Sequence, residues 1–131
     1  MFLDRRIFSQ EAHQALTEIQ GKLSPAYYSK ASGLIQGLSA YISTWGLHRL
    51  AGDAEKFLLG TAEDTTYKGE VYRHFLVRLR AFSDIDFDPT DEGSLIHLPL
   101  AKYTALNRLG MQLAKEWSFW AAAVLGEATE S

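Results

Sequence analysis

Residues 103–124 read YTALNRLGMQLAKEWSFWAAAV, and this stretch decides the fold. Its large side chains and one glycine recur at alternating steps of three and four: Tyr103, Leu106, Gly110, Leu113, Trp117, Trp120 and Val124. That spacing puts them on one face of an α-helix, which turns once about every 3.6 residues. Gly126 comes next and is a typical helix end. The stretch therefore predicts a long helix over about residues 99–125.

Four earlier segments have the same helical spacing of apolar residues. They cover about residues 4–22, 25–45, 47–59 and 66–82. Ser24-Pro25 is a helix-start signal, because serine caps a helix and proline suits its first turn. No segment alternates convincingly between apolar and polar residues, as a half-buried strand would. We therefore expect an all-α bundle of five to six helices, folded as a single domain over residues 1–131.

Two segments are expected to be loops. Residues 61–66 are polar, and residues 83–99 hold two of the three prolines. Within the second segment, Ser94 to Leu98 is expected to add a short helical turn. Its first part, about residues 83–93, contains five carboxylates and no base: Asp84, Asp86, Asp88, Asp91 and Glu92. We call this segment the acidic loop and expect it to be exposed.

Composition excludes several classes of protein. The chain has 131 residues, 47% of them hydrophobic, and no cysteine, which rules out disulfides, thiolate zinc sites and cysteine catalysis. Its longest apolar run, residues 120–125, is far shorter than the ~20 residues of a membrane span. The first residues turn charged at Asp4 and show no apolar signal segment. We therefore expect a cytoplasmic protein.

The acidic loop only partly resembles a calcium-binding loop. Asp84, Asp86 and Asp88 match the first three ligand positions, but Pro89 stands where glycine is required and Leu95 where glutamate is required. The four histidines are far apart and are expected at the surface or its boundary. We therefore predict no metal site, and the chain also has no nucleophile-elbow, phosphate-loop or dinucleotide-binding motif. We expect no cofactor, no catalytic residues and no enzymatic activity.

Gly33 and Gly37 form a Gly-x-x-x-Gly step. In a membrane this step would favour dimerisation. In this chain we expect it instead to let a neighbouring helix or a bulky side chain approach closely.

The net charge of −3 hides a mildly basic body. Without the five acids of the acidic loop, thirteen bases face eleven acids. The basic residues expected to form a strip that follows a phosphate backbone without reading bases are Lys30, Arg49, Arg73, Arg78, Arg80, Arg108 and Lys115. Two pairs, Arg73/Arg80 and Arg108/Lys115, are seven residues apart and so project from nearly the same side of a helix. The alternative is a set of ordinary solvated helix faces.

Several segments together resemble a known family. Tyr28-Ser-Lys-Ala-Ser-Gly-Leu-Ile35, Trp45-Gly-Leu47 and Tyr72 with Leu76 and Leu79 are similar to segments of the small helical subunit of type III-B (Cmr-type) CRISPR–Cas effector complexes. The best match is the last helix, from Tyr103-Thr-Ala-Leu-Asn-Arg108 through Trp117-Ser-Phe-Trp-Ala121. The likeness covers about residues 22–126, in order and spacing more than in any single motif.

The resemblance implies a non-catalytic subunit. Copies would stack head to tail along the effector, beside the backbone subunits that hold the guide RNA, and help to bind the target strand. Its partners would be other effector subunits (backbone and large subunits), copies of itself and guide RNA–target nucleic acid, with no membrane. The same helical unit also occurs in other type III and type I effectors, so the subtype stays open.

The chain departs from the family pattern in three places. Trp45-Gly-Leu47 stands for Asn-Gly-Leu, Ser118-Phe119-Trp120 follows Trp117 where Lys or Arg is frequent, and the net charge is acidic. Trp117, Phe119 and Trp120 cannot easily all face one core, so we expect a protein interface among them. The rival hypothesis is a helical protein-only adaptor or homo-oligomerising scaffold.

Overall fold

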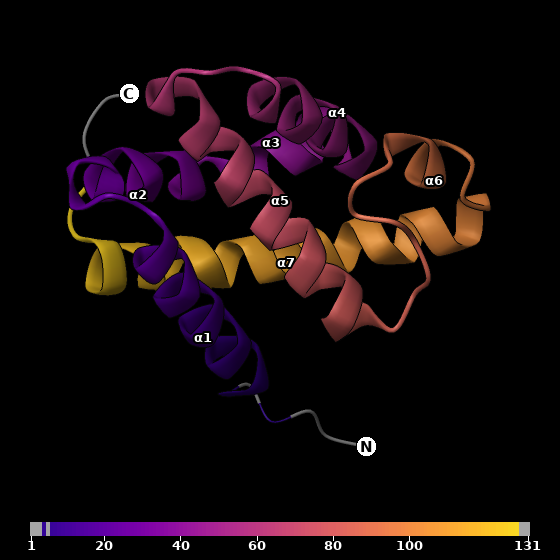
Figure 1. The fold of residues 1–131 in the computed structure, drawn as a ribbon. Helices are drawn as coiled ribbons and strands as arrows, with labels where there is room; N and C mark the ends of the chain where they lie inside the picture. Colours follow the sequence, from indigo (N-terminus) through magenta and orange to yellow (C-terminus); the bar gives the residue numbers. More distant parts are fainter. Residues whose placement is uncertain (1–3, 5, 129–131) are drawn as a thin grey trace.

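The computed structural model describes Asp4 and residues 6–128, and within them the chain is all-helical. The elements are α1 (Arg6–Lys22), the 3₁₀ turn η1 (Pro25–Tyr27), α2 (Tyr28–Gln36), α3 (Leu38–Trp45), α4 (Leu47–Leu58), α5 (Glu63–Ser83), α6 (Glu92–Ile96) and α7 (Leu100–Leu125). Figure 1 shows α7 running across the molecule with α5 crossing over it. The all-α prediction is confirmed, with seven α-helices in this part of the chain instead of five to six.

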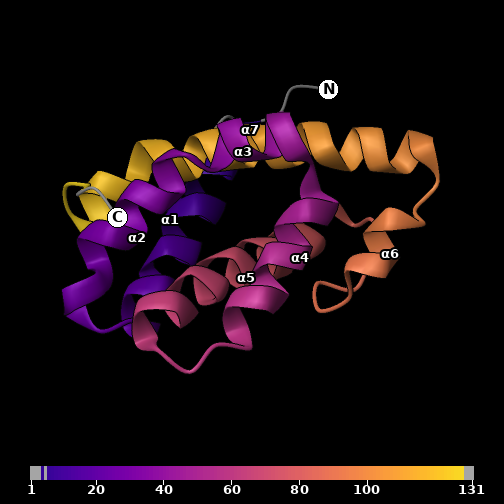
Figure 2. The same ribbon diagram turned by 90° about the horizontal axis from the view of Figure 1, so that it is seen from above.

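The helices pack around one hydrophobic core, to which every α-helix contributes. α2 and α3 lie along α7, and α4 packs beside α5 (Figure 2). The largest fully buried side chain is Trp117 of α7, whose ring meets Phe75 of α5 edge-on at a centroid distance of 5.0 Å. The last helix, whose apolar face was predicted, thus forms the support against which α1, α2 and α3 pack.

The predicted helix over residues 25–45 is divided at Gly37. The Gly37 N–H donates to the Leu34 carbonyl at 3.2 Å, a three-residue step in place of the four-residue step of an α-helix. A Cβ at Gly37 would meet only the Leu34 carbonyl oxygen, at 3.7 Å. The expected close packing at this glycine is therefore wrong. A close approach of this kind is found instead at Gly69 of α5, where a Cβ would lie 2.6 Å from Cγ of Leu58 on α4.

The loop expected at residues 61–66 is shorter than predicted, because α5 begins at Glu63. Glu63 and Asp64 lie in its first turn, where carboxylates favour a helix by facing the positive end of its dipole. Sequence reasoning took their polarity as a loop signal. The carboxylate of Glu63 also accepts a hydrogen bond from the Ser24 hydroxyl at 2.6 Å, which joins the start of α5 to the turn after α1.

The acidic loop is anchored at its centre. Phe87 is only 5% exposed and belongs to the core, so the segment is not uniformly exposed as expected. The carboxylate of Asp88 accepts hydrogen bonds from the Thr90 amide and hydroxyl, at 2.8 and 2.7 Å. Asp91 caps α6 by accepting from the Gly93 amide at 2.9 Å, and α6 accounts for the short helical turn predicted here.

Candidate nucleic-acid interface

Four of the seven predicted basic residues are held in ion pairs within the chain. These pairs are Lys30–Asp64 at 3.0 Å, Arg73–Glu55 at 2.9 Å, Arg78–Glu11 at 2.6 Å and Arg80–Asp86 at 3.1 Å. In each pair the carboxylate lies on a different segment of the chain from the base and neutralises the charge of that base. A single strip that joins all seven bases is therefore absent from the described part of the chain.

Arg78 is the least accessible of the four. Its side chain is 19% exposed and donates two hydrogen bonds to Glu11 of α1, at 2.6 and 2.8 Å. Those hydrogen bonds, with the nearby charges of Glu11 and Glu18, raise the pKa of Arg78 above its ordinary value despite its burial. Arg78 thus joins α5 to α1, and little of its side chain is left free for a phosphate.

Arg73 and Arg80 do not form the shared free face that their spacing indicated. Arg73 turns to Glu55 on α4 and is 21% exposed. Arg80 pairs with Asp86, so the acidic loop folds back onto the end of α5. A nucleic acid would have to displace a carboxylate at either position.

The remaining three, Arg49, Arg108 and Lys115, are exposed and form no ion pair with any residue that the structure describes. Arg49 on α4 lies over the ring of Trp45, with its guanidinium carbon 4.6 Å from the ring centroid. Arg108 and Lys115 are both on α7, two turns apart on the same side.

These two bases belong to a continuous exposed face of α7, which we call the α7 stripe. Its members recur at steps of three and four, and each is exposed: Ala101, Thr104, Arg108, Gln112, Lys115, Phe119 and Ala122. A stripe of this length spans about 32 Å along the helix axis. It contains no carboxylate, and the one acidic residue of α7, Glu116, is engaged by Ser9 and Trp120.

The three aromatic residues predicted as a protein interface have different environments. Trp117 is fully buried, so its assignment to an interface is corrected: it is a core residue that offers no surface. Phe119 is 71% exposed. Trp120 is half-buried, donates from Nε1 to Glu116 at 3.3 Å, and meets Phe119 edge-on with centroids 5.0 Å apart. The expectation that the three cannot share one core is confirmed.

Trp120 also forms one wall of an open groove along α1, with a volume of about 780 Å³. The ring of His13 meets that of Trp120 edge-on at 6.1 Å. Beside these rings the groove is lined by four uncharged hydrogen-bonding side chains and by one base and one carboxylate: Ser9, Gln10, Gln14, Thr17, Arg6 and Glu18. The α7 stripe and this groove are thus joined through the neighbouring rings of Phe119 and Trp120.

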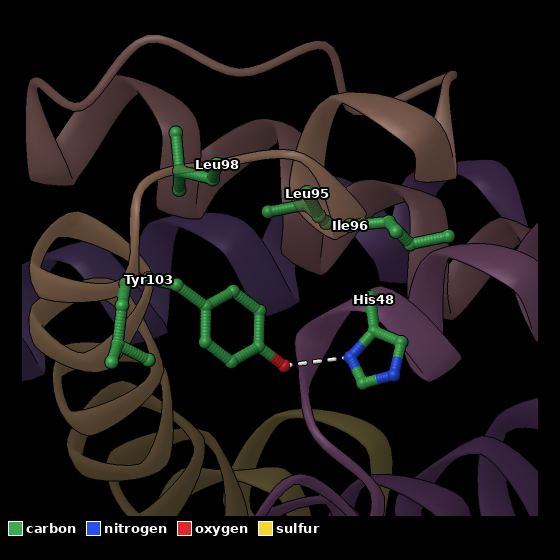
Figure 3. Close-up of a pocket in the computed structure, with 6 residues that line it drawn as sticks. His48, Leu95, Ile96, Leu98 and Tyr103 are labelled. Carbon is green, nitrogen blue, oxygen red and sulfur yellow. Dashed lines mark hydrogen bonds between the residues drawn. The ribbon is translucent and has the colours of Figure 1, made fainter.

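A smaller cavity of about 260 Å³ lies between α4, α6 and the start of α7 (Figure 3). Inside it, Nδ1 of His48 is 2.7 Å from the hydroxyl of Tyr103. Gly46 directly precedes α4 with φ +84°, and a Cβ there would lie 2.2 Å from that hydroxyl. Next to it, the Leu47 amide donates to Oδ1 of Asn107 at 3.1 Å. The Trp45-Gly-Leu47 turn is therefore built directly onto α7.

His74 is the one histidine that the structure buries, which corrects the expectation that all four lie at the surface or its boundary. Its ring contacts Glu18 and Lys22 of α1. Burial, reinforced by the charge of Lys22, lowers its pKa below 6.5 despite the hydrogen bond to Glu18.

In the described residues, no three His, Asp or Glu side chains are arranged to hold a metal ion. Of the helices described here, none combines the length and hydropathy that a membrane crossing requires.

Comparison of the chain with protein-family models, with curated proteins and with solved structures finds no match.

The α7 stripe could have been found from the sequence, but the groove could not. The recurrence of residues 101, 104, 108, 112, 115, 119 and 122 is a helical pattern like that of the buried face, displaced around the helix. Thr104, one turn before Arg108, and Gln112, between Arg108 and Lys115, were missed. The groove depends on the packing of α1 beside Trp120, about 100 residues away in sequence, which no local pattern encodes.

Proposed function

We propose that this chain is the non-catalytic small subunit of a cytoplasmic RNA-guided CRISPR effector complex. In this function it packs beside other effector subunits and copies of itself, and contacts the backbone of the guide–target nucleic acid without reading its sequence. The proposal assigns it no cofactor.

The observation that carries the proposal is the contact between two of the segments that resemble the Cmr-type small subunit. Trp45-Gly-Leu47 and Tyr103–Arg108 are more than fifty residues apart, yet Gly46, Leu47 and His48 contact Tyr103 and Asn107. Gly46 is required there by both its positive φ and the position of the Tyr103 hydroxyl. The similar residues thus serve one structural feature, which supports a shared fold more strongly than separate degenerate motifs would.

The α7 stripe supports the nucleic-acid contact. Arg108 and Lys115 are exposed, lack ion pairs among the described residues, and share a helix face without carboxylates. Contacts of this type neutralise phosphates and position a strand without sequence specificity. Because the whole chain has a net charge of −3, we expect it to need neighbouring subunits for a complete groove.

A second candidate function is a protein-only helical adaptor. It is favoured by exposed large apolar side chains: Trp45 is 50% exposed, Ile96 55%, Leu100 79% and Phe119 71%. Such side chains are enriched where proteins meet partners. They fit a subunit of a larger assembly equally well, so the two functions differ in whether nucleic acid is bound.

Co-expression with the products of neighbouring genes tests the proposal. We expect effector backbone subunits to be encoded nearby and to co-purify with this chain. In the assembled complex, the double variant Arg108→Glu/Lys115→Glu should weaken target binding for all sequences alike, and the loss should shrink at high salt. The control is the double variant Lys56→Glu/Lys68→Glu, which reverses the same number of charges on other helices. Unaltered target binding with normal assembly would favour the adaptor, and absence of effector genes nearby would contradict the assignment itself.

A further inference from the structure

The α7 stripe and the groove on α1 differ in chemistry and adjoin each other. The stripe offers two bases, Arg108 and Lys115, about 10.5 Å apart along the helix axis. Beyond Lys115, one turn further along, Phe119 presents a ring that is 71% exposed. Its neighbour Trp120 then borders the groove of about 780 Å³. Cations, an exposed aromatic ring and a partly apolar groove therefore follow one another on one surface.

This order matches the chemistry of an unpaired nucleic-acid strand. Proteins that bind single strands combine cations, which follow the phosphates, with aromatic rings on which bases stack. The groove adds the side-chain amides of Gln10 and Gln14, which can donate to and accept from the edges of bases. The one carboxylate of α7, Glu116, accepts hydrogen bonds from Ser9 and Trp120 and is not a member of the stripe.

We propose that the α7 stripe and the α1 groove bind single-stranded nucleic acid, with phosphates on Arg108 and Lys115 and an unpaired base stacked on Phe119. The inference rests on the proposed function, in which this chain contacts nucleic acid, and adds which state of the strand it recognises. A duplex keeps its bases stacked on one another and offers none to Phe119, so the site prefers unpaired nucleotides to paired ones.

Fluorescence anisotropy of the full chain tests this inference without any other subunit. The probes are a fluorescein-labelled oligouridine of about 15 nucleotides, within the range that single-strand sites cover, and a mixed-sequence duplex of the same length. At about 50 mM salt we expect binding in the micromolar range, stronger for the single strand than for the duplex.

Two variants separate the phosphate contacts from the stacking. Arg108→Glu/Lys115→Glu should lower the affinity and reduce the slope of log affinity against log salt by about 1.4, because two phosphate contacts are lost. Phe119→Ala should weaken single-strand binding roughly 5- to 150-fold and leave the salt slope unchanged. Lys56→Glu and Leu59→Ala are the matched controls, since Lys56 is an exposed base and Leu59 a 77% exposed apolar residue, both outside the stripe.

Three results would overturn the inference. These are no binding of either probe at about 100 μM protein, equal binding of the duplex, and no effect of Phe119→Ala on single-strand binding. If Phe119→Ala instead disrupts assembly with a protein partner and leaves oligouridine binding intact, the surface is a protein interface. Failure of this assay leaves co-purification with effector subunits unaffected, so the two proposals fail separately.

Discussion

Nε2 of His74 on α5 lies 2.9 Å from Oε1 of Glu18 on α1. On the other side of the ring, Nζ of Lys22 is 3.3 Å from Nδ1. A lysine ammonium can only donate, so Nδ1 accepts and the Nε2–H donates to Glu18. This arrangement requires a neutral imidazole, because protonation would place a second donor against Lys22.

We expect this histidine to make folding stability depend on pH. Burial and the charge of Lys22 lower the pKa of His74 below 6.5, so the unfolded chain takes up this proton at a higher pH than the folded chain does. The contribution of His74 to the free energy of unfolding is therefore fully present above about pH 6.5 and falls as the pH drops from there through the folded-state pKa. Urea denaturation at several pH values measures this, and His74→Gln should flatten the profile because glutamine does not titrate. Equal slopes in wild type and His74→Gln would exclude His74 as the source of the pH dependence.

Arg78 and Arg80 should differ in their contribution to stability although they are two residues apart. Arg78 and Glu11 are 19% and 15% exposed, so Arg78→Ala leaves a carboxylate mostly buried without its partner. We expect a loss of about 2 kcal/mol in the free energy of unfolding, between the values for exposed and buried pairs. Arg80 pairs with Asp86, which is 96% exposed, and Arg80→Ala should cost less than about 0.5 kcal/mol. Chemical denaturation compares the two, and the double variant Arg78→Met/Glu11→Leu should regain part of the loss. Equal costs for Arg78→Ala and Arg80→Ala would mean that burial of the first pair is unimportant.

The helices could be predicted where side-chain spacing alone decides them. The face of α7 from Leu106 to Trp117 is regular and is buried along its length, so its periodicity predicted both the helix and the core. The same reasoning missed the division between α2 and α3, because apolar spacing continues through Gly37 while the backbone there takes a three-residue hydrogen bond. Spacing reports which side chains share a face, and it does not report the hydrogen bond of a single peptide group.

The candidate site could be predicted only in part, for a related reason. The seven-residue step from Arg108 to Lys115 is local and survives in the structure as one exposed face. The partner of Arg78 is 67 residues away, on a helix that reaches it only after folding. Positive charges in a sequence therefore mark candidates, and the tertiary positions of the carboxylates decide which of them stay free.

Trp117 and Phe119 should show opposite sensitivities to truncation. Trp117 is fully buried against Phe75, and Trp117→Ala should cost about 3–5 kcal/mol, mostly through the cavity it leaves. Phe119 is 71% exposed, so Phe119→Ala should change the free energy of unfolding by less than about 0.5 kcal/mol. Urea denaturation followed by circular dichroism gives both values. A large loss for Phe119→Ala would mean that its ring is needed for folding, and it could then not be used to test ligand binding.

Gly46 and Gly52 offer a matched pair of glycine-to-alanine substitutions on either side of the start of α4. Gly46 has φ +84°, and a Cβ there would lie 2.2 Å from the Tyr103 hydroxyl. Gly46→Ala therefore strains the backbone and displaces Tyr103 from His48, and we expect it to cost about 2–3 kcal/mol. Gly52 is inside α4 with no atom within 4 Å of its Cβ position, so Gly52→Ala should stabilise the chain by about 0.5–1 kcal/mol. Denaturant midpoints measure the two shifts.

Tyr103→Phe added to Gly46→Ala separates the two causes of destabilisation, because removal of the hydroxyl relieves the steric conflict and leaves the backbone strain. A Gly46→Ala variant as stable as wild type would show that α4 and α7 can separate at this turn without cost, and the contact between the two family-like segments would then lose its structural basis.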